Sequence, residues 1–274
     1  MTDATLRENR VTEWICLEYH NVVPTTPALS GSPDYFSVST AAFNQQLDRI
    51  RQRGLLGCSI AAAMRSDGRP RLAISFDDGD AGQYERAFPA LVARGMTATF
   101  FIVTGWVGRP AYVTWNQLRE MRDAGMSIQS HTHTHAPLTE LSPERVAEEL
   151  RRSREEIDRE LDQQTDTIAF PGGFFPSGAY REQVRDAGYR VMATSNWGRN
   201  GGHEPADGVF VVRRCTVHGA PSLEWFDRVV DRDRWLAWRH GAKEMLLNGF
   251  KAALGPGRYV RWRSRFLDGV GKVR

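Results

Sequence analysis

Two adjacent aspartates, Asp77 and Asp78, follow an apolar run at 72–76 and precede a glycine. Neighbouring side chains on an extended backbone point to opposite sides. One carboxylate can therefore bind a metal ion while the other stays free as a base. Asp-Asp-Gly is also a common turn sequence, because aspartate forms local hydrogen bonds and glycine tolerates positive φ. A second motif is needed before the pair indicates a site.

A histidine-rich segment at 131–135 (His-Thr-His-Thr-His) also follows a strand-like stretch. The spacing of His131 and His135 would bring both imidazoles to one face of a helical turn, and His133 would then point away in a structural role. Imidazole and carboxylate are ligands of catalytic zinc and related divalent ions. Such a run can also be a solvated loop. Because both motifs follow strand-like stretches, we expect them at one edge of a sheet, which favours a metal site.

These motifs, Ser-Phe-Asp-Asp-Gly at 75–79 and Ser-His-Thr-His-Thr-His at 130–135, resemble the first two motifs of the polysaccharide deacetylase family. That family is built on the NodB homology domain and forms carbohydrate esterase family 4. Segments 16–20 and 168–173 support the resemblance, which covers about residues 12–218. Within the family, the sequence is most similar to the subgroup related to poly-N-acetylglucosamine deacetylases.

The resemblance implies a role for each motif residue. Asp78, His131 and His135 are the expected ligands of a divalent metal, with zinc as first choice and cobalt or manganese as alternatives. Asp77 is the expected general base. A divalent cation lowers the pKa of bound water from about 15.7 to about 7, and Asp77 would accept a proton as that water attacks an amide carbonyl. Gly172 would donate its backbone N–H to the tetrahedral oxyanion.

Two departures from the family pattern concern the base and the acid. Ala169 stands where many relatives carry an arginine that pairs with the catalytic aspartate, so this motif gives Asp77 no direct charge partner and leaves its pKa open. The change marks a subgroup. The general acid of many relatives is a late histidine, which His218 matches poorly. His20, in a Tyr-His pair after the first strand, is the preferred acid, although it could simply cap that strand.

Substrate contacts are predicted in the loops that follow the strands. Pro171 lies beside the expected oxyanion donor. In a later loop, Trp197 could stack on a pyranose face, while Asn196 and Arg199 could hydrogen-bond hydroxyl groups. The alternative is a glycine-rich connector whose tryptophan packs on the protein. The stretch 104–108 (Thr-Gly-Trp-Val-Gly) is a similar candidate for sugar binding.

Strand-like and helix-like segments alternate along the chain, which predicts a parallel α/β fold. The resemblance implies a distorted (β/α) barrel, for which the sequence offers about seven parallel strands, and the sequence also predicts a basic helical extension at the C-terminal end. In such barrels catalytic residues gather at the carboxyl ends of the strands, where both motifs are expected. Strands are expected near 14–19, 72–76, 97–103, 126–130, 166–170, 189–194 and 209–213.

The clearest helix is expected after Ser142, a typical N-cap residue, with Pro143 in its first turn. Apolar residues then recur at spacings of four and seven, which places them on one helix face. These residues are Val146, Leu150, Ile157 and Leu161.

The 274 residues are divided into a catalytic domain at 1–221 and an extension at 222–274. A hydrophobic content of 41% is enough for a substantial core. Three scattered cysteines indicate neither a disulfide framework nor a structural zinc site, which fits a reduced compartment. The first twenty residues lack a secretion signal, and no apolar run is long enough to span a membrane. We therefore expect a cytoplasmic protein, or one peripheral at the inner membrane face.

The segment 225–274 differs from the rest in charge, with twelve Lys and Arg against five Asp and Glu. Basic and aromatic residues together suit an anionic membrane surface or an acidic glycan. The alternative is a helix that packs on the barrel and leaves its charges in solvent. No recognised nucleic-acid motif accompanies the charge, so no nucleic-acid partner is expected. An apolar stripe at helical spacing accompanies it: Trp235, Trp238, Met245, Leu246, Phe250 and Leu254.

Three functions are consistent with these patterns. The leading hypothesis is a metal-dependent deacetylase that hydrolyses the acetamide of N-acetylated sugars in a bacterial polysaccharide or glycan intermediate. A second is a C–N hydrolase of the same fold that acts on a small non-carbohydrate amide. A third is a catalytically silent carbohydrate-binding protein, against which the retention of Asp77 and the three ligands argues. The patterns choose neither the glycan nor an oligomeric state.

Overall fold

The computed structural model describes residues 13–25, 36–65, 71–173, 178–201, 205, 207–217 and 221–233. Within these residues, nine strands form one sheet in which every pair is parallel. Their order is β10-β9-β8-β7-β6-β5-β1-β11, and β4 pairs with β5 beside this path. The strands are β1 (Ile15–Tyr19), β4 (Leu56–Cys58), β5 (Arg71–Phe76), β6 (Thr99–Ile102), β7 (Ser127–Ser130), β8 (Thr167–Ala169), β9 (Val191–Thr194), β10 (Phe210–Arg213) and β11 (Cys215–Thr216).

The last two strands nearly close the sheet into a barrel. β10 pairs with β9, whereas β11 pairs with β1, and Arg214 alone separates β10 from β11. The chain thus changes its pairing partner from one end of the strand order to the other at this residue. β1 and β10 are in contact as well. This arrangement confirms the expected distorted barrel.

Each of the seven expected strands is present, with ends within a few residues of the predicted ones. The sheet has two further members, β4 and β11, of three and two residues. The sequence analysis did not identify these two short strands, so the expected number of about seven strands was too low. A separate parallel pair joins β2 (Val22–Val23) to β3 (Val38–Ser39).

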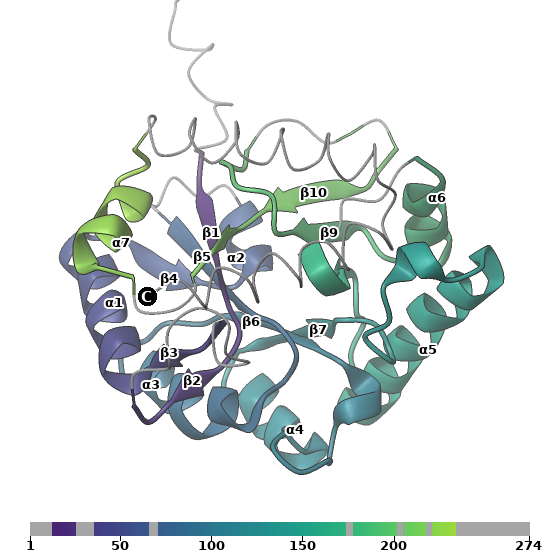
Figure 1. The fold of residues 1–274 in the computed structure, drawn as a ribbon, viewed down its shortest axis with the longest axis horizontal. Helices are drawn as coiled ribbons and strands as arrows, with labels where there is room; N and C mark the ends of the chain where they lie inside the picture. Colours follow the sequence, from purple (N-terminus) through teal and green to yellow (C-terminus); the bar gives the residue numbers. More distant parts are fainter. Residues whose placement is uncertain are drawn as a thin grey trace, which may run out of the picture.

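Helices surround the strands (Figure 1). The expected long helix, α5, begins at Pro143 with Ser142 as its N-cap, and its four predicted core residues are buried. Burying each such aliphatic side chain contributes about 1.5–3 kcal/mol, which fixes the helix on the barrel. The helices are α1 (Thr40–Gln52), α2 (Ile60–Met64), α3 (Phe88–Val92), α4 (Trp115–Asp123), α5 (Pro143–Leu161), α6 (Gly178–Asp186) and α7 (Leu223–Val230).

Side chains alternate between the two faces of the barrel strands. On β1 and β5, Leu17 and Ile74 belong to the core between strands and helices. Cys16 and Ala73 belong instead to a second core, which also contains Phe101 of β6. Glu18 comes two residues after Cys16, and the same alternation places its side chain on the interior face. The barrel interior is therefore lined by small and apolar residues, with polar groups at the carboxyl ends of the strands.

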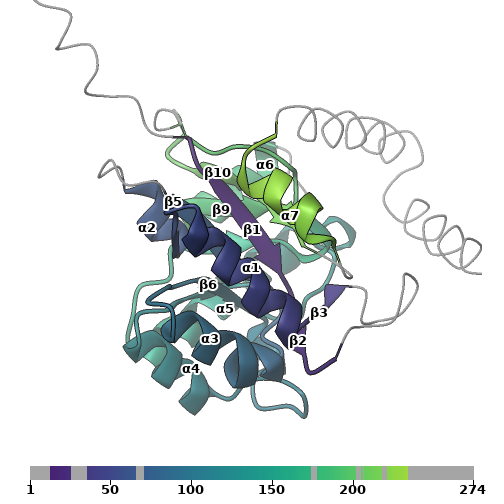
Figure 2. The same cartoon turned by 90° about the vertical axis from the view of Figure 1, so that its left-hand side faces the viewer.

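The first turns of the predicted C-terminal extension pack on the barrel domain. Phe226, Val229 and Val230 of α7 are buried in the same core as α1, and the two helices lie side by side (Figure 2). Arg53, after α1, binds Asp231 at 2.6 Å. Residues 234–274 carry the predicted membrane-binding stripe and lie outside the described residues, so that hypothesis stays a prediction.

No helix in the described part of the chain is long and apolar enough to cross a membrane.

Candidate active site

Three of the predicted ligands converge at the carboxyl ends of β5 and β7. Asp78 Oδ1 lies 3.4 Å from His131 Nε2 and 3.2 Å from His135 Nε2. This oxygen is buried and has no hydrogen-bond partner within the described part of the chain. A buried carboxylate oxygen that faces two imidazole nitrogens fits a divalent cation, because these are the donor types that zinc and related ions take. The cluster is one of two in the described residues with metal-ligand spacing.

The two aspartates separate because the chain turns between them. Asp77 follows β5, whereas Asp78 has a φ of 79° in the left-handed region. The expected alternation along an extended backbone is therefore wrong for Asp78, although the two carboxylates do have different partners, Arg214 for Asp77 and the two histidines for Asp78. Burial alone would raise the pKa of Asp78, but the contacts of His131 and His135 hold that pKa far below its usual range.

The histidine segment is an irregular loop, so the expected helical turn is wrong. Thr132 and His135 have φ values of 66° and 63°, in a region that residues other than glycine rarely adopt. The loop nevertheless faces both imidazoles toward Asp78. His131 Nδ1 donates to the carbonyl oxygen of Ala169 at 3.0 Å, which leaves Nε2 free to bind a metal, as outer-shell partners of metal-binding histidines commonly do.

Asp77 forms a bidentate ion pair with Arg214. Nη1 of the guanidinium donates to Oδ1 at 2.5 Å, and Nη2 donates to Oδ2 at 2.8 Å. Arg214 is fully buried and Asp77 is 2% exposed. Burial raises the pKa of Asp77, but the charges of Arg214 and His131 outweigh this effect and lower it to about 2. Asp77 is therefore an ionised carboxylate at neutral pH.

Glu18 of β1 holds the other side of Arg214. Nη2 of the guanidinium also donates to Glu18 Oε1 at 3.1 Å. Glu18 is 2% exposed, and it accepts further hydrogen bonds from Ser195 Oγ at 2.7 Å and Thr216 Oγ1 at 2.6 Å. Glu18, His20 and Asp77 form the second cluster with metal-ligand spacing. Arg214 already binds both carboxylates of that cluster, so Asp78 with the two histidines is the better candidate for a metal site.

The sequence does contain a signal for Arg214. Side chains alternate along β10 and into β11, so Val212 and Arg214 share the buried face while Arg213 is exposed. An arginine at an inward-facing strand position must find buried carboxylates, because an unpaired buried charge is very costly. Reading the alternation across residues 211–216 would therefore have predicted an interior arginine.

His20 lies at the carboxyl end of β1, beside Asp77. One of its ring nitrogens is within 4.8 Å of carboxylate oxygens of Glu18 and Asp77. Its Nδ1 is buried and has no partner among the residues described. Gln83 Nε2 donates to the backbone carbonyl oxygens of both His20 and Asp77, which joins the two segments. His218, the other candidate acid, lies outside the described residues.

The predicted oxyanion donor lies after β8. Pro171 is buried and Gly172 is exposed, with a φ of 72°. This turn follows Ala169, whose carbonyl oxygen orients His131, so it stands next to the metal-ligand cluster. Asn196, another predicted substrate contact, lies beside Arg214, because its carbonyl oxygen accepts a hydrogen bond from the backbone N–H of Arg214 at 3.1 Å. The roles of Pro171, Gly172 and Asn196 in substrate binding stay predictions.

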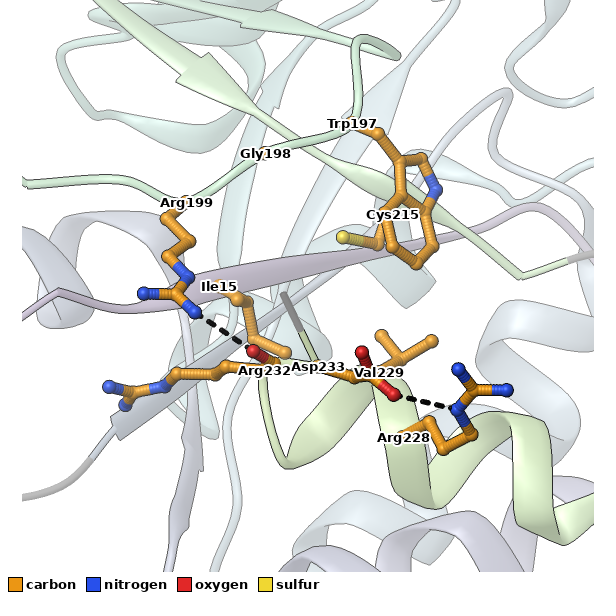
Figure 3. Close-up of a pocket in the computed structure, with 9 residues that line it drawn as sticks. All are labelled: Ile15, Trp197, Gly198, Arg199, Cys215, Arg228, Val229, Arg232 and Asp233. Carbon is orange, nitrogen blue, oxygen red and sulfur yellow. Dashed lines mark hydrogen bonds and ion pairs between the residues drawn. The ribbon is translucent and has the colours of Figure 1, made fainter. Parts of the chain in front are cut away.

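The structure does not bring Trp197 and Arg199 to the metal-ligand cluster. They line a small pocket beside Ile15 at the start of β1 and Val229 of α7 (Figure 3), whereas His20 follows the end of β1. Trp197 packs against Trp225 with ring centroids 6.1 Å apart. Contacts of Trp197 and Arg199 with a substrate stay predictions that their position disfavours.

Another tryptophan does stand beside the cluster. Trp106 lies with its ring centroid 4.9 Å from that of His135 and 5.0 Å from that of Tyr112. Both Trp106 and Tyr112 are partly exposed. They give the metal-ligand cluster an aromatic border, within or close to the stretch 104–108 that the sequence had indicated.

Comparison with known proteins agrees with this geometry. Residues 65–192 match the family model for polysaccharide deacetylases. This part of the chain belongs to the polysaccharide deacetylase family. It is 35% identical over 162 residues to a polysaccharide deacetylase homologue of Bacillus subtilis, YxkH, and the match covers 58% of this chain and 55% of YxkH.

Two further similarities are to an N-deacetylase of Escherichia coli and to a solved structure from Ammonifex degensii. The chain is 28% identical over 141 residues to the poly-β-1,6-N-acetyl-D-glucosamine N-deacetylase of Escherichia coli K12, which covers 43% of this chain and 20% of that enzyme. It is 27% identical to the solved structure of IcaB from Ammonifex degensii, with a TM-score of 0.65 and coverage of 80% of this chain and 95% of that one. The chain spans about half or less of the length of the two curated relatives.

The arginine that is absent at position 169 has a counterpart elsewhere in the structure. Ala169 offers only a backbone oxygen, which His131 uses. The positive charge beside Asp77 is instead the guanidinium of Arg214, the residue between β10 and β11. The expectation that the Ala169 motif lacks a charge partner for Asp77 is thus correct, but the aspartate is paired from another strand.

Proposed function

We propose that this protein is a metal-dependent deacetylase that hydrolyses the acetamide of N-acetylated sugar residues in a bacterial polysaccharide or glycan intermediate. The observation that carries the proposal is the contrast between the adjacent aspartates. Asp78 faces two imidazoles, as a metal ligand would. Asp77 is buried against Arg214, as an ionised base would be. This pairing of a ligand with a proton acceptor suits hydrolysis of an amide.

Asp78, His131 and His135 would hold the cation, for which zinc is the first choice and cobalt or manganese are alternatives. When bound, such a cation lowers the pKa of water and polarises an amide carbonyl. Asp77 Oδ2 lies 3.9 Å from His131 Nε2, so it is close enough to the ligands to accept the proton of the attacking water. His20 would protonate the leaving amine, and the N–H of Gly172 would stabilise the oxyanion.

The similarity to poly-β-1,6-N-acetyl-D-glucosamine N-deacetylase supports an N-acetylglucosamine polymer as the substrate class. The second candidate is a small non-carbohydrate amide. Acetate release from chito-oligosaccharides, β-1,6-linked N-acetylglucosamine oligomers, peptidoglycan fragments and simple acetamides separates the two, with added zinc, cobalt or manganese in turn. We expect release from the oligosaccharides. Hydrolysis of the simple acetamides alone would favour the second candidate.

Replacing His20 with alanine is expected to lower kcat for an N-acetylsugar about 10²- to 10⁴-fold, the range for loss of a general acid. An activated ester such as 4-nitrophenyl acetate releases a group that needs no protonation, so its hydrolysis should fall far less. Acetate and nitrophenol release by the same preparation measure both, and His218→Ala is the matched control. Equal losses on both substrates would show that His20 is not the acid.

Replacing Trp106 with alanine is expected to raise KM for oligosaccharides with little change in kcat. Pairs of aromatic rings contribute about 0.5–1.5 kcal/mol, and a contribution of the same size from a sugar face on Trp106 would correspond to a change in KM of about two- to twelvefold. The matched control is Trp197→Ala, because Trp197 packs beside α7 away from the ligands. Steady-state kinetics on an oligosaccharide series measure the effect. A larger rise in KM for Trp197→Ala than for Trp106→Ala would show that the sugar binds at the loop after β9 instead.

A further inference from the structure

Glu149, in the middle of α5, is a buried carboxylate that the proposed mechanism does not use. It is 4% exposed, and it faces the histidine loop. Its Oε2 accepts hydrogen bonds from the backbone N–H of His133 at 3.0 Å and of Thr134 at 2.8 Å. Its Oε1 accepts a third from Thr134 Oγ1 at 2.8 Å. Three donors thus compensate the burial of this charged group.

The loop that Glu149 holds has an unfavourable backbone conformation. Thr132 and His135 lie in the left-handed region, which persists in non-glycine residues only where the surroundings over-determine it. Within the loop, the N–H of His135 donates to Thr132 Oγ1 at 3.2 Å. The two residues bound by Glu149 lie between these strained positions. The helix therefore holds the loop between its two strained residues.

A second set of contacts fixes the same loop through His133. Glu156, two turns after Glu149 on α5, lies with Oε2 3.1 Å from His133 Nδ1. The turn after β6 adds Thr104 Oγ1 at 2.8 Å from the same nitrogen and the N–H of Gly105 at 2.9 Å from the His133 carbonyl oxygen. A Cβ on Gly105 would lie 2.6 Å from that oxygen. His133 thus has the expected structural role, because its contacts with α5 and with the turn after β6 hold the loop in place.

We propose that Glu149 is a positioning residue for the metal site. By holding the backbone of His133 and Thr134, it keeps the flanking imidazoles of His131 and His135 facing Asp78, and it thereby raises the affinity of the site for a divalent cation. The inference rests on the proposed metal-binding role of these three residues. It concerns a residue that contacts neither the cation nor the substrate directly, since its hydrogen-bond partners within the described part of the chain all lie in the histidine loop.

The test compares zinc affinity with fold stability. Glu149→Ala removes all three acceptors, whereas Glu149→Gln keeps one amide oxygen that can still accept the two N–H groups. Glu155→Gln is the matched control, because Glu155 lies on the same helix but is exposed and pairs with Arg151. Zinc affinity is measured by competition with a chromophoric chelator, and thermal unfolding is measured on the metal-free proteins.

Loss of an outer-shell partner typically weakens metal binding about 10- to 100-fold, and we expect this loss for Glu149→Ala, a smaller one for Glu149→Gln and none for the control. A folded Glu149→Ala protein that binds zinc as tightly as the unchanged protein would overturn the proposal. So would a drop in metal-free stability without a change in affinity. If the alanine variant does not fold, wild-type affinity in Glu149→Gln has the same force. Absence of zinc binding by the unchanged protein would instead refute the proposed metal site itself.

Discussion

Replacing Arg214 with methionine is expected to abolish hydrolysis and to destabilise the fold by about 3–5 kcal/mol, the usual cost of removing one partner from a buried ion pair. The substitution would leave Asp77 and Glu18 buried without their shared cation. Urea unfolding measures the stability, and acetate release measures the activity. Arg213→Met is the matched control, because Arg213 is the adjacent residue and is exposed.

A substitution that conserves the charge distinguishes the effect of the positive charge from the effect of the guanidinium geometry at position 214. Lysine keeps a positive charge but cannot form the two parallel hydrogen bonds of a guanidinium. We therefore expect Arg214→Lys to retain more stability than the methionine variant and to lose most of its kcat. Equal stability and activity of the Arg214 and Arg213 variants would contradict the assigned pairing.

The same ion pair determines how activity depends on pH in any Arg214 variant that retains measurable activity. In the unchanged protein, Arg214 and His131 outweigh burial and lower the pKa of Asp77 to about 2. Without Arg214, burial gains weight and the pKa rises, so Asp77 becomes protonated at a higher pH. The acidic limb of the kcat/KM profile should therefore move to higher pH in any variant that retains measurable activity. An unchanged acidic limb would show that Asp77 does not titrate as the base.

The sequence predicts the helices and strands well where a pattern of apolar residues extends over a long segment. The alternation of strand-like and helix-like segments predicted β1 and every strand from β5 to β10, and the spacing of four and seven predicted α5 with its N-cap Ser142. β4 and β11, of three and two residues, were missed. Local pattern therefore determines the main elements, whereas the closure of the barrel depends on a strand pair that local pattern does not show.

The metal-ligand cluster was predictable because both ligand motifs follow strands, β5 and β7, and parallel strands end at the same edge. The conformation that brings the ligands together was not predictable. A helical turn and an irregular loop can both bring His131 and His135 together, and the left-handed backbone at Thr132 depends on distant partners such as Glu149. Spacing alone does not distinguish the two.

The partners of the base come from far along the chain. Arg214 stands 137 residues from Asp77 and 196 from Glu18. Arg213 and Arg214 look equivalent in the sequence, and only the alternation of strand side chains decides which one enters the barrel. For Trp197 the neighbouring residues in the sequence suggested a sugar contact, whereas in the structure its ring packs against Trp225.

The adjacent aspartates provide the sharpest contrast, because the same small substitution should have two different effects. Asp77→Asn keeps the shape of the side chain but removes the proton acceptor, so hydrolysis should fall about 10²- to 10⁴-fold while the metal stays bound. Asp78→Asn replaces a carboxylate ligand that faces both imidazoles. That variant should lose most of its metal and its activity with it.

The most direct measurement is metal content and acetate release determined on the same preparations of the unchanged protein, Asp77→Asn and Asp78→Asn. We predict wild-type metal content with a rate lowered at least about 100-fold for Asp77→Asn, and loss of both metal and rate for Asp78→Asn. A fully active Asp77→Asn protein, or one as depleted of metal as Asp78→Asn, would contradict the assignment of Asp77 as base and Asp78 as ligand.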